Sequence, residues 1–189
     1  MPFQRKELRR LFSIDRAMLV IVDVQQKLTN VMHDRERLIH EFDKLIRGMI
    51  TIEVPVIMTE QNPSGLGPTI AEIKALLPEL KPISKMSFSC LGEEEFSRRL
   101  KVSGRSQVIL TGIETHVCVY QTAMDLAGAG YDVQVVSDCV SSRTKANKEL
   151  ALQKMRAAGI GITGTEMILF ELLKTADNPR FRDIAAIIK

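Results

Sequence analysis

The chain has 189 residues, of which 45% are hydrophobic and 26% are charged. These proportions are typical of a globular protein and exclude a fibrous, low-complexity or largely disordered chain. The formal net charge of +3 is too small to indicate a nucleic-acid or membrane-surface partner, and no apolar stretch approaches the ~20 residues that a membrane-spanning helix needs. The length predicts a single domain over residues 1–189, with a core large enough to be stable without disulfides or metals.

Cysteine and histidine usage bears on the cellular compartment and on metal binding. The three cysteines, Cys90, Cys118 and Cys139, are widely spaced and form no CxxC pair. This pattern is typical of reduced thiols in a cytoplasmic protein and not of a secreted disulfide framework. The acidic Glu7 near the N-terminus is unlike a signal peptide, and a mitochondrial location is the weaker alternative to the cytoplasmic one. No two of the three histidines have metal-ligand spacing, so we expect no metal and no other cofactor.

Short apolar runs rich in β-branched residues predict the strands. In chain order they are residues 17–24, 54–59, 82–85, 107–112, 131–137 and 159–163, of which 82–85 is short and 159–163 is weak. The runs do not alternate between apolar and polar side chains. They are therefore typical of strands that are covered on both faces, as in a parallel sheet.

Segments with helical periodicity lie between these strands. They are residues 35–51, 69–77, 93–102, 115–127, 144–158 and 165–174. In the first of them Leu38, Phe42, Leu45 and Met49 fall on one stripe, which predicts a helix with one face against the sheet.

The alternation of strand and helix predicts an α/β fold. We expect a three-layer sandwich with a mostly parallel six-stranded sheet, Rossmann-like, in the strand order 3-2-1-4-5-6 with right-handed crossovers. Ligands of such sheets bind beyond the carboxyl ends of the strands, at the point where the strand order reverses. Here that point lies between the first and fourth strands, just after Val22 and Gly112.

Three residues near this point can carry chemistry. Asp23 follows the first strand, Lys85 ends the third, and Cys118 lies in the first turn of the helix after the fourth. We expect the helix dipole to lower the pKa of the Cys118 thiol, and Lys85 to stabilise a thiolate or an oxyanion. Each also has an ordinary explanation, as a turn residue, a solvated lysine and a small packing residue. The predicted topology favours chemistry because it brings all three together.

The chain resembles the isochorismatase-like cysteine hydrolases from residue 17 to residue 173. The resemblance rests on the segments VIVDVQQ (20–26), SKMSFS (84–89), TGIETHVCV (111–119) and VSDCVSSR (136–143). It implies that Asp23, Lys85 and Cys118 form a catalytic triad. It also implies a cis peptide bond between Ile113 and Glu114, in a loop whose backbone N–H groups, with that of Cys118, receive an oxyanion. Family members are usually oligomers, so we expect a homo-oligomer.

Two departures from the family narrow the expectation. Residues 59–69 contain no histidine, whereas the nicotinamidases of the superfamily bind a metal through histidines there, so a metal-dependent nicotinamidase is disfavoured. Isochorismatases proper lack the nucleophilic cysteine, so Cys118 disfavours their vinyl-ether chemistry as well. The chain looks most like the poorly characterised, metal-free branch of the family.

The expected function is hydrolysis of a small amide-like C–N bond through a thioester on Cys118. The substrate is a small molecule, and we expect Gln25, Leu28, Gln61 and Phe88 to form its pocket. One alternative is a catalytically idle family member that acts as a binding or scaffold protein. Another is a thiol redox protein that uses Cys118 with Cys90 or Cys139.

Overall fold

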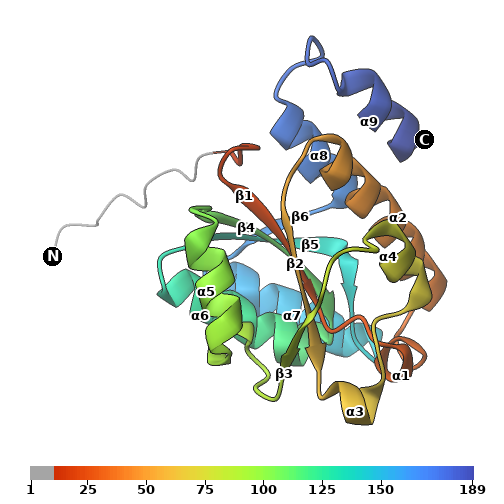
Figure 1. The fold of residues 1–189 in the computed structure, drawn as a ribbon, viewed down its shortest axis with the longest axis vertical. Coiled ribbons are helices and arrows are strands. Elements are labelled where there is room, and N and C mark those ends of the chain that lie inside the picture. Colours follow the sequence, from red (N-terminus) through yellow and green to blue (C-terminus); the bar gives the residue numbers. More distant parts are fainter. Residues whose placement is uncertain (1–10) are drawn as a thin grey trace, which may run out of the picture.

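Six parallel strands form one sheet at the centre of the protein. The structure, a computed structural model, describes residues 11–189, so the N-terminal segment on which the localisation was predicted lies outside the described residues. The strand order is β3-β2-β1-β4-β5-β6, which confirms the predicted order 3-2-1-4-5-6 (Figure 1). The strands are β1 (Ala17–Val22), β2 (Val56–Gln61), β3 (Ile83–Lys85), β4 (Gln107–Ile113), β5 (Asp132–Ser141) and β6 (Gly161–Thr163).

Helices cover both faces of the sheet. One face carries α2 (Arg35–Thr51), α4 (Ala71–Leu76), α8 (Thr165–Leu173) and α9 (Phe181–Ile188). The other carries α5 (Glu94–Val102), α6 (Tyr120–Gly128) and α7 (Lys145–Ala157). Short helical turns, α1 (Gln26–Thr29), α3 (Pro63–Leu66), η1 (Cys90–Gly92) and the π-helical η2 (Thr115–Val119), lie in the connections.

The central strand β1 separates two hydrophobic cores. Alternate side chains of β1 point to opposite faces, so Leu19 and Ile21 pack under α2 and α8, whereas Val20 and Val22 pack under α5 and α6. All six residues of β1 are buried. This explains the uninterrupted apolar run of the sequence, because a strand with helices on both faces has no solvent-facing side.

The strand after β4 is longer than its apolar run suggests. The predicted strand 131–137 is β5, Asp132–Ser141, which continues through polar residues. Val135 pairs with Leu110, but Val140 pairs with Gly112, so residues 136–139 form a bulge between two registers. The bulge carries the carboxylate of Asp138 to the start of α8, where it accepts hydrogen bonds from the backbone N–H and hydroxyl of Thr165.

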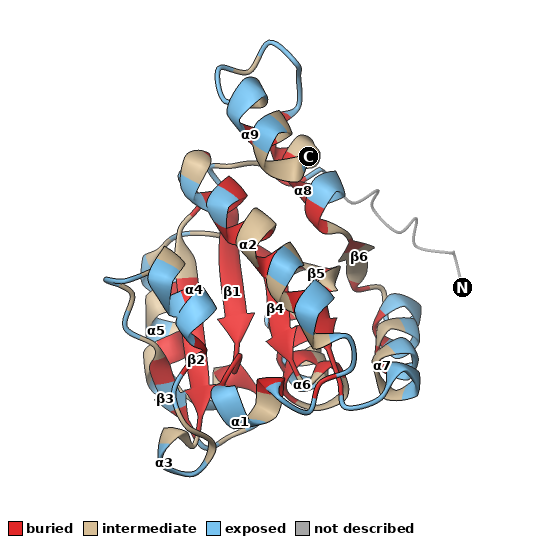
Figure 2. Cartoon of the chain, turned by 90° about the vertical axis from the view of Figure 1, so that its right-hand side faces the viewer, coloured by how far each residue is buried: buried red, intermediate tan, exposed pale blue. Residues whose placement is uncertain are grey.

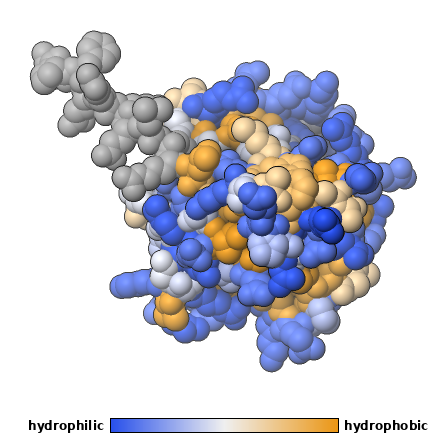
Figure 3. Space-filling view, turned by 90° about the horizontal axis from the view of Figure 1, so that it is seen from above, coloured by the Kyte–Doolittle hydropathy of each residue, from blue (hydrophilic) through white to orange (hydrophobic). Residues whose placement is uncertain are grey.

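The carboxyl ends of the strands point to one end of the molecule, where α1 and α3 lie (Figure 2). At the opposite end, hydrophobic side chains gather among hydrophilic ones (Figure 3). A shallow apolar groove at the amino-terminal end of the sheet is lined by Ile50, Val56 and residues 76–80. Within residues 11–189, no helix is both long and apolar enough to cross a membrane.

Gly112 allows β1 and β4 to approach closely beside the switch point. Its φ is +122°, and an ideal Cβ there would lie 2.1 Å from the backbone oxygen of Val22. Glycine is the residue that adopts this conformation without a side-chain clash. The glycine of the TGIETHVCV segment is therefore required by the strand that holds Asp23.

We predict that Gly112→Ala lowers the free energy of unfolding by ~3 kcal/mol or more, because the added methyl group meets rigid backbone. Gly130→Ala is the matched control, since its φ is +89° but no heavy atom lies within 4 Å of the built Cβ. The control should lose only the ~1–2 kcal/mol of an unfavourable φ. Urea unfolding measures both, and equal losses would contradict the steric explanation.

Candidate active site

Asp23 is buried at the carboxyl end of β1. Its φ of 54° turns the chain out of the strand direction, so β1 ends at Val22 rather than at the predicted residue 24. The carboxylate Oδ1 accepts a hydrogen bond of 2.7 Å from the hydroxyl of Thr59, which lies on the neighbouring strand β2. The Oδ2 atom lies 2.7 Å from Nζ of Lys85. The carboxylate, which water no longer solvates, is thus stabilised by a cation and a hydroxyl.

Lys85 ends β3, and its ammonium group is enclosed by oxygen atoms. Both its side chain and that of Asp23 have an exposed fraction of 0%. Besides Asp23, Nζ donates to Oε1 of Gln61 at 2.7 Å and to the carbonyls of Ser87 and Phe88 at 3.0 and 3.1 Å. A buried ammonium group needs such partners to offset its lost hydration.

Cys118 lies in η2, directly after β4, and is 6% exposed. Its thiol lies close enough to Asp23 for the negative charge of the carboxylate to raise the pKa of the thiol. The structure therefore brings Asp23, Lys85 and Cys118 together, from the ends of β1 and β3 and the segment that follows β4. All three lie at the switch point between β1 and β4.

The electrostatics of the cluster correct one prediction. Burial, together with the negative charge of Asp23, raises the pKa of the Cys118 thiol to about 12, so the predicted lowering by the helix dipole is wrong. The physical reason is that desolvation and a neighbouring carboxylate both disfavour the thiolate, and they outweigh the dipole and Lys85. Burial also raises the pKa of the Asp23 carboxyl, which the charge of Lys85 opposes.

These directions define the resting cluster at neutral pH. The Cys118 thiol is neutral, because its pKa is about 12. The carboxylate and the ammonium form an ion pair in which each compensates the burial of the other. Such a cluster suits a cysteine that is activated by an adjacent base, rather than one that rests as a thiolate.

The side chains of Gln25 and Gln61, which we predicted to line the pocket, form hydrogen bonds between neighbouring loops. The amide of Gln25 donates to the carbonyls of Gln61 and Gly67 and accepts from the backbone N–H of Gln61. The side chain of Gln61 accepts from Lys85 and donates to the carbonyl of Met86. The two amides thereby fix the loops after β1, β2 and β3 relative to one another, and Gln61 positions the lysine.

The role of Leu28 and Phe88 as pocket walls stays a prediction, and one of these side chains is half-buried and the other exposed. Leu28 packs against the hydrophobic core under α2. Phe88 is 52% exposed, and it is the backbone carbonyl of Phe88 that faces the site. The reason is that the segment after β3 turns its carbonyls inward around Lys85, which directs the side chains of Met86 and Phe88 outward.

The loop between β4 and Cys118 contains a cis peptide bond at Ile113–Glu114, the position at which the resemblance placed one. The carboxylate of Glu114 accepts from Arg143 at 3.0 Å. Its backbone carbonyl accepts from the N–H groups of Val117 and Val119. Glu114, the N-cap of η2, is therefore held by Arg143 through its side chain and by the first turn of η2 through its carbonyl.

The loop after β2 offers little to a metal ion. Glu60, the potential carboxylate ligand near the end of β2, accepts hydrogen bonds from both the backbone N–H and the hydroxyl of Thr69 at 2.7 Å. Over residues 11–189 there is no group of three histidine, cysteine, aspartate or glutamate side chains that could hold a metal ion.

Two contributors were missed in the sequence. Thr59 ends the apolar run of β2, and a polar residue at the carboxyl end of a strand next to β1 is the signal that could have identified it. The carbonyls of Ser87 and Phe88 have no signal in the sequence, because any residue type supplies the same backbone oxygen.

Known proteins are similar to this chain in sequence and in the arrangement of helices and strands. Residues 17–167 match the family model of the isochorismatase domain. The secreted isochorismatase effector Isc1 of Phytophthora sojae is 40% identical over 177 residues, which are 92% of this chain and 84% of that protein. The structure of MAR1 ribonuclease from Caenorhabditis elegans is 34% identical, with a TM-score of 0.89 and coverage of 95% of this chain and 92% of that one.

A further solved structure carries a covalent adduct. YcaC from Pseudomonas aeruginosa, described with hexane-2,5-diol and covalent acrylamide, is 25% identical with a TM-score of 0.88, and covers 99% of this chain and 92% of that one. The family model spans residues 17–167, and the chain covers 84% of the P. sojae protein and 92% of each of the two solved structures. The chain therefore belongs to the isochorismatase-like hydrolase family.

Proposed function

We propose that the protein is a cysteine-dependent hydrolase that cleaves a small amide-like C–N bond through a thioester. The observation that carries the proposal is the buried ion pair between Asp23 and Lys85 beside the Cys118 thiol, whose pKa is raised by burial and by the charge of Asp23. A nucleophile next to a base, with the base held by a third group, is the arrangement of covalent catalysis.

In the proposed reaction, Asp23 takes the thiol proton while Sγ of Cys118 attacks the carbonyl carbon. The N–H groups of Val117 and Val119 are already bonded to Glu114, so we assign the oxyanion to the N–H of Cys118 and the preceding loop. Asp23 then gives its proton to the leaving amine, and the C–N bond breaks. Water, deprotonated by Asp23, cleaves the thioester and releases the carboxylic acid and the free thiol.

Lys85 has a defined task in this scheme. Its charge lowers the pKa of Asp23, against the larger effect of burial, and so keeps the base ionised. A carboxyl with a raised pKa is also a better proton acceptor than an ordinary aspartate, which suits a base that works near neutral pH. The proposal assigns the thiolate a transient role, because its formation is coupled to attack on the carbonyl.

The alternatives receive less support. Redox-active cysteines are exposed and have low pKa values, whereas Cys90, Cys118 and Cys139 are all buried free thiols. Burial raises the pKa of Cys90 to about 11 and that of Cys139 well above its ordinary value. An idle scaffold would not need an ion pair buried beside a thiol. The expected homo-oligomer stays a prediction.

We predict that Cys118→Ser lowers turnover of an accepted amide by at least ~10³-fold, because the nucleophile is removed and the fold is kept. A panel of small amides and ureides, assayed by ammonia release, identifies the substrate. Acrylamide belongs in the panel because it is covalently bound in the P. aeruginosa relative. RNA belongs there because of the name of the C. elegans relative.

The matched control is Cys139→Ala, which removes a buried thiol in β5, on the other side of β4 from β1. It should retain turnover. Equal activity of the Cys118→Ser variant and the unmodified protein would refute the thioester mechanism, and cleavage of RNA alone would replace the proposed substrate class.

We predict that Asp23→Asn lowers the pKa of the Cys118 thiol from about 12 while abolishing hydrolysis. The substitution removes the negative charge that disfavours the thiolate and leaves the positive charge of Lys85, so the thiolate forms at lower pH. Turnover is lost because no base carries the proton to the leaving amine. Ultraviolet absorbance of the thiolate, referenced to the same variant with Cys118→Ser, measures the titration. A thiol that titrates near neutral pH in the unmodified protein would contradict the assignment.

A further inference from the structure

A cavity of about 560 Å³ opens between α2, β5 and α7. Neither Asp23, Lys85 nor Cys118 lines it. The pairing between β5 and β6 covers Gln134, Val135 and Val136 and ends there. The bulged half of β5 therefore continues without β6 beside it, which leaves room for the cavity. Its volume is that of pockets which hold small organic ligands.

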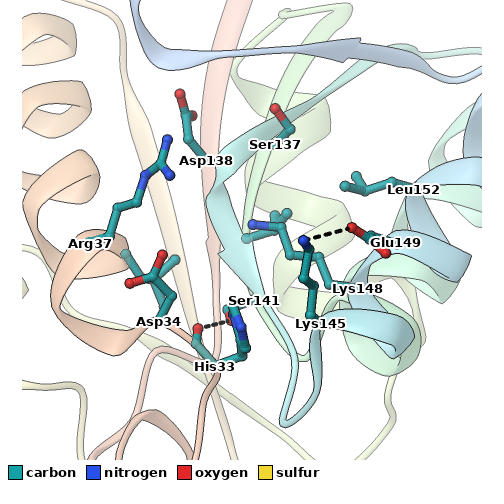
Figure 4. Close-up of a pocket in the computed structure, with 12 residues that line it drawn as sticks. His33, Asp34, Arg37, Ser137, Asp138, Ser141, Lys145, Lys148, Glu149 and Leu152 are labelled. Carbon is teal, nitrogen blue, oxygen red and sulfur yellow. Dashed lines mark hydrogen bonds and ion pairs between the residues drawn. The ribbon is translucent and has the colours of Figure 1, made fainter.

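Two cations face each other across this cavity. Arg37 reaches into it from α2 and Lys148 from α7, and both side chains are directed to the same space (Figure 4). Among the ion pairs of residues 11–189, neither side chain has a partner. Burial and the charge of Arg37 lower the pKa of Lys148, which the carboxylates of Asp138 and Asp34 oppose. An anion bound between these two side chains would be attracted by both charges.

Two of the three carboxylates that line the cavity have a hydrogen-bond or ion-pair partner. Asp138 accepts both the backbone N–H and the hydroxyl of Thr165 at the start of α8. Glu149 lies 3.6 Å from Lys145, on its own helix. Asp34 has no side-chain hydrogen bond or ion pair to another residue of the range 11–189. Asp34 and Asp138 both keep their negative charge, but neither carboxylate is within ion-pair distance of Arg37 or Lys148.

The helices add to the positive potential. Both α2 and α7 begin at the rim of the cavity, with N-caps at Asp34 and Thr144. The first turn of α7 contains no acidic residue, and it begins with Lys145. Basic residues at the positive end of a helix are destabilising, whereas an anion there is stabilising. The sequence thus departs from the usual charge pattern at the start of α7, whereas the first turn of α2 contains Glu36.

We propose that this cavity binds a small organic anion, whose phosphate or carboxylate group is held between Arg37 and Lys148. Asp34 accepts a hydroxyl group of the same ligand at the rim. A guanidinium group matches the planar oxygen pairs of such anions, and a lysine supplies a second charge. The site is separate from the candidate triad and does not depend on the proposed hydrolysis.

Isothermal titration calorimetry on the full chain, at constant ionic strength, tests the proposal with inorganic phosphate, glycerol 3-phosphate and malonate as probes. Saturable binding of the phosphates, or of malonate, supports the site and identifies the anionic group. Arg37→Gln and Lys148→Gln should each weaken binding by about tenfold or more. Arg156→Gln, an exposed cation at the other end of α7, is the matched control and should leave binding unchanged.

Two further measurements show whether a variant loses binding because it is destabilised, and where on the protein the ligand binds. Lys148→Gln should melt at the same or a higher temperature than the unmodified protein, because it removes a charge that burial and Arg37 disfavour. In isotopically labelled unmodified protein, the ligand should shift the backbone amide resonances of Ser137 and Lys148. Absence of saturable binding would overturn the proposal. So would Arg37→Gln and Lys148→Gln variants that bind as tightly as the unmodified protein, or loss of binding in Cys118→Ala.

Discussion

The arrangement of the site depends on one interaction, the buried ion pair between Asp23 and Lys85. Neither charge is exposed, so each would be strongly unfavourable without the other. The folded state raises the pKa of Asp23 above its value of 3.8 in a model compound, and the unfolded chain does not. The folded state therefore binds the Asp23 proton more tightly, and stability decreases as the pH rises from the unfolded value through the folded one. Folding thus retains a base at a cost in stability, a pattern common at functional sites.

The rest of the structure holds this pair in place. The parallel sheet places the carboxyl ends of β1, β2 and β3 side by side, so Asp23, Thr59 and Lys85 meet without a long loop. Gln25 and Gln61 link the loops that follow these strands. Gly112 lets β4 lie against β1, which brings the helix that carries Cys118 to the carboxylate. The nucleophile, the base and the cation are therefore positioned by backbone packing and not by flexible side chains.

The sequence predicted the fold and the three central residues because both follow from local patterns. Apolar runs identified strands with two covered faces, and topology then placed Asp23, Lys85 and Cys118 at one point. The sequence did not predict features that depend on the surroundings of a residue in the folded protein. The thiol pKa was predicted from the helix dipole and from Lys85, whereas burial and Asp23 decide its direction. The carbonyls of Ser87 and Phe88 that surround Lys85 were missed, because every residue type supplies the same backbone oxygen. The cavity beside β5 lies next to a bulge in that strand, and no pattern of residue types in the sequence predicts this bulge.

The central claim is that Lys85 keeps Asp23 ionised as the base beside a neutral thiol. The most direct measurement is the pKa of Asp23, followed by carbon-detected NMR on protein labelled at the aspartate carboxyls, in the unmodified chain and in Lys85→Met. Lys81→Met, which removes a surface lysine just before β3, is the control. The account predicts that Lys85→Met raises the pKa of Asp23 further, because the cation that lowers it is gone, and that the control leaves it unchanged. An Asp23 pKa that stays constant or falls in Lys85→Met would contradict the account.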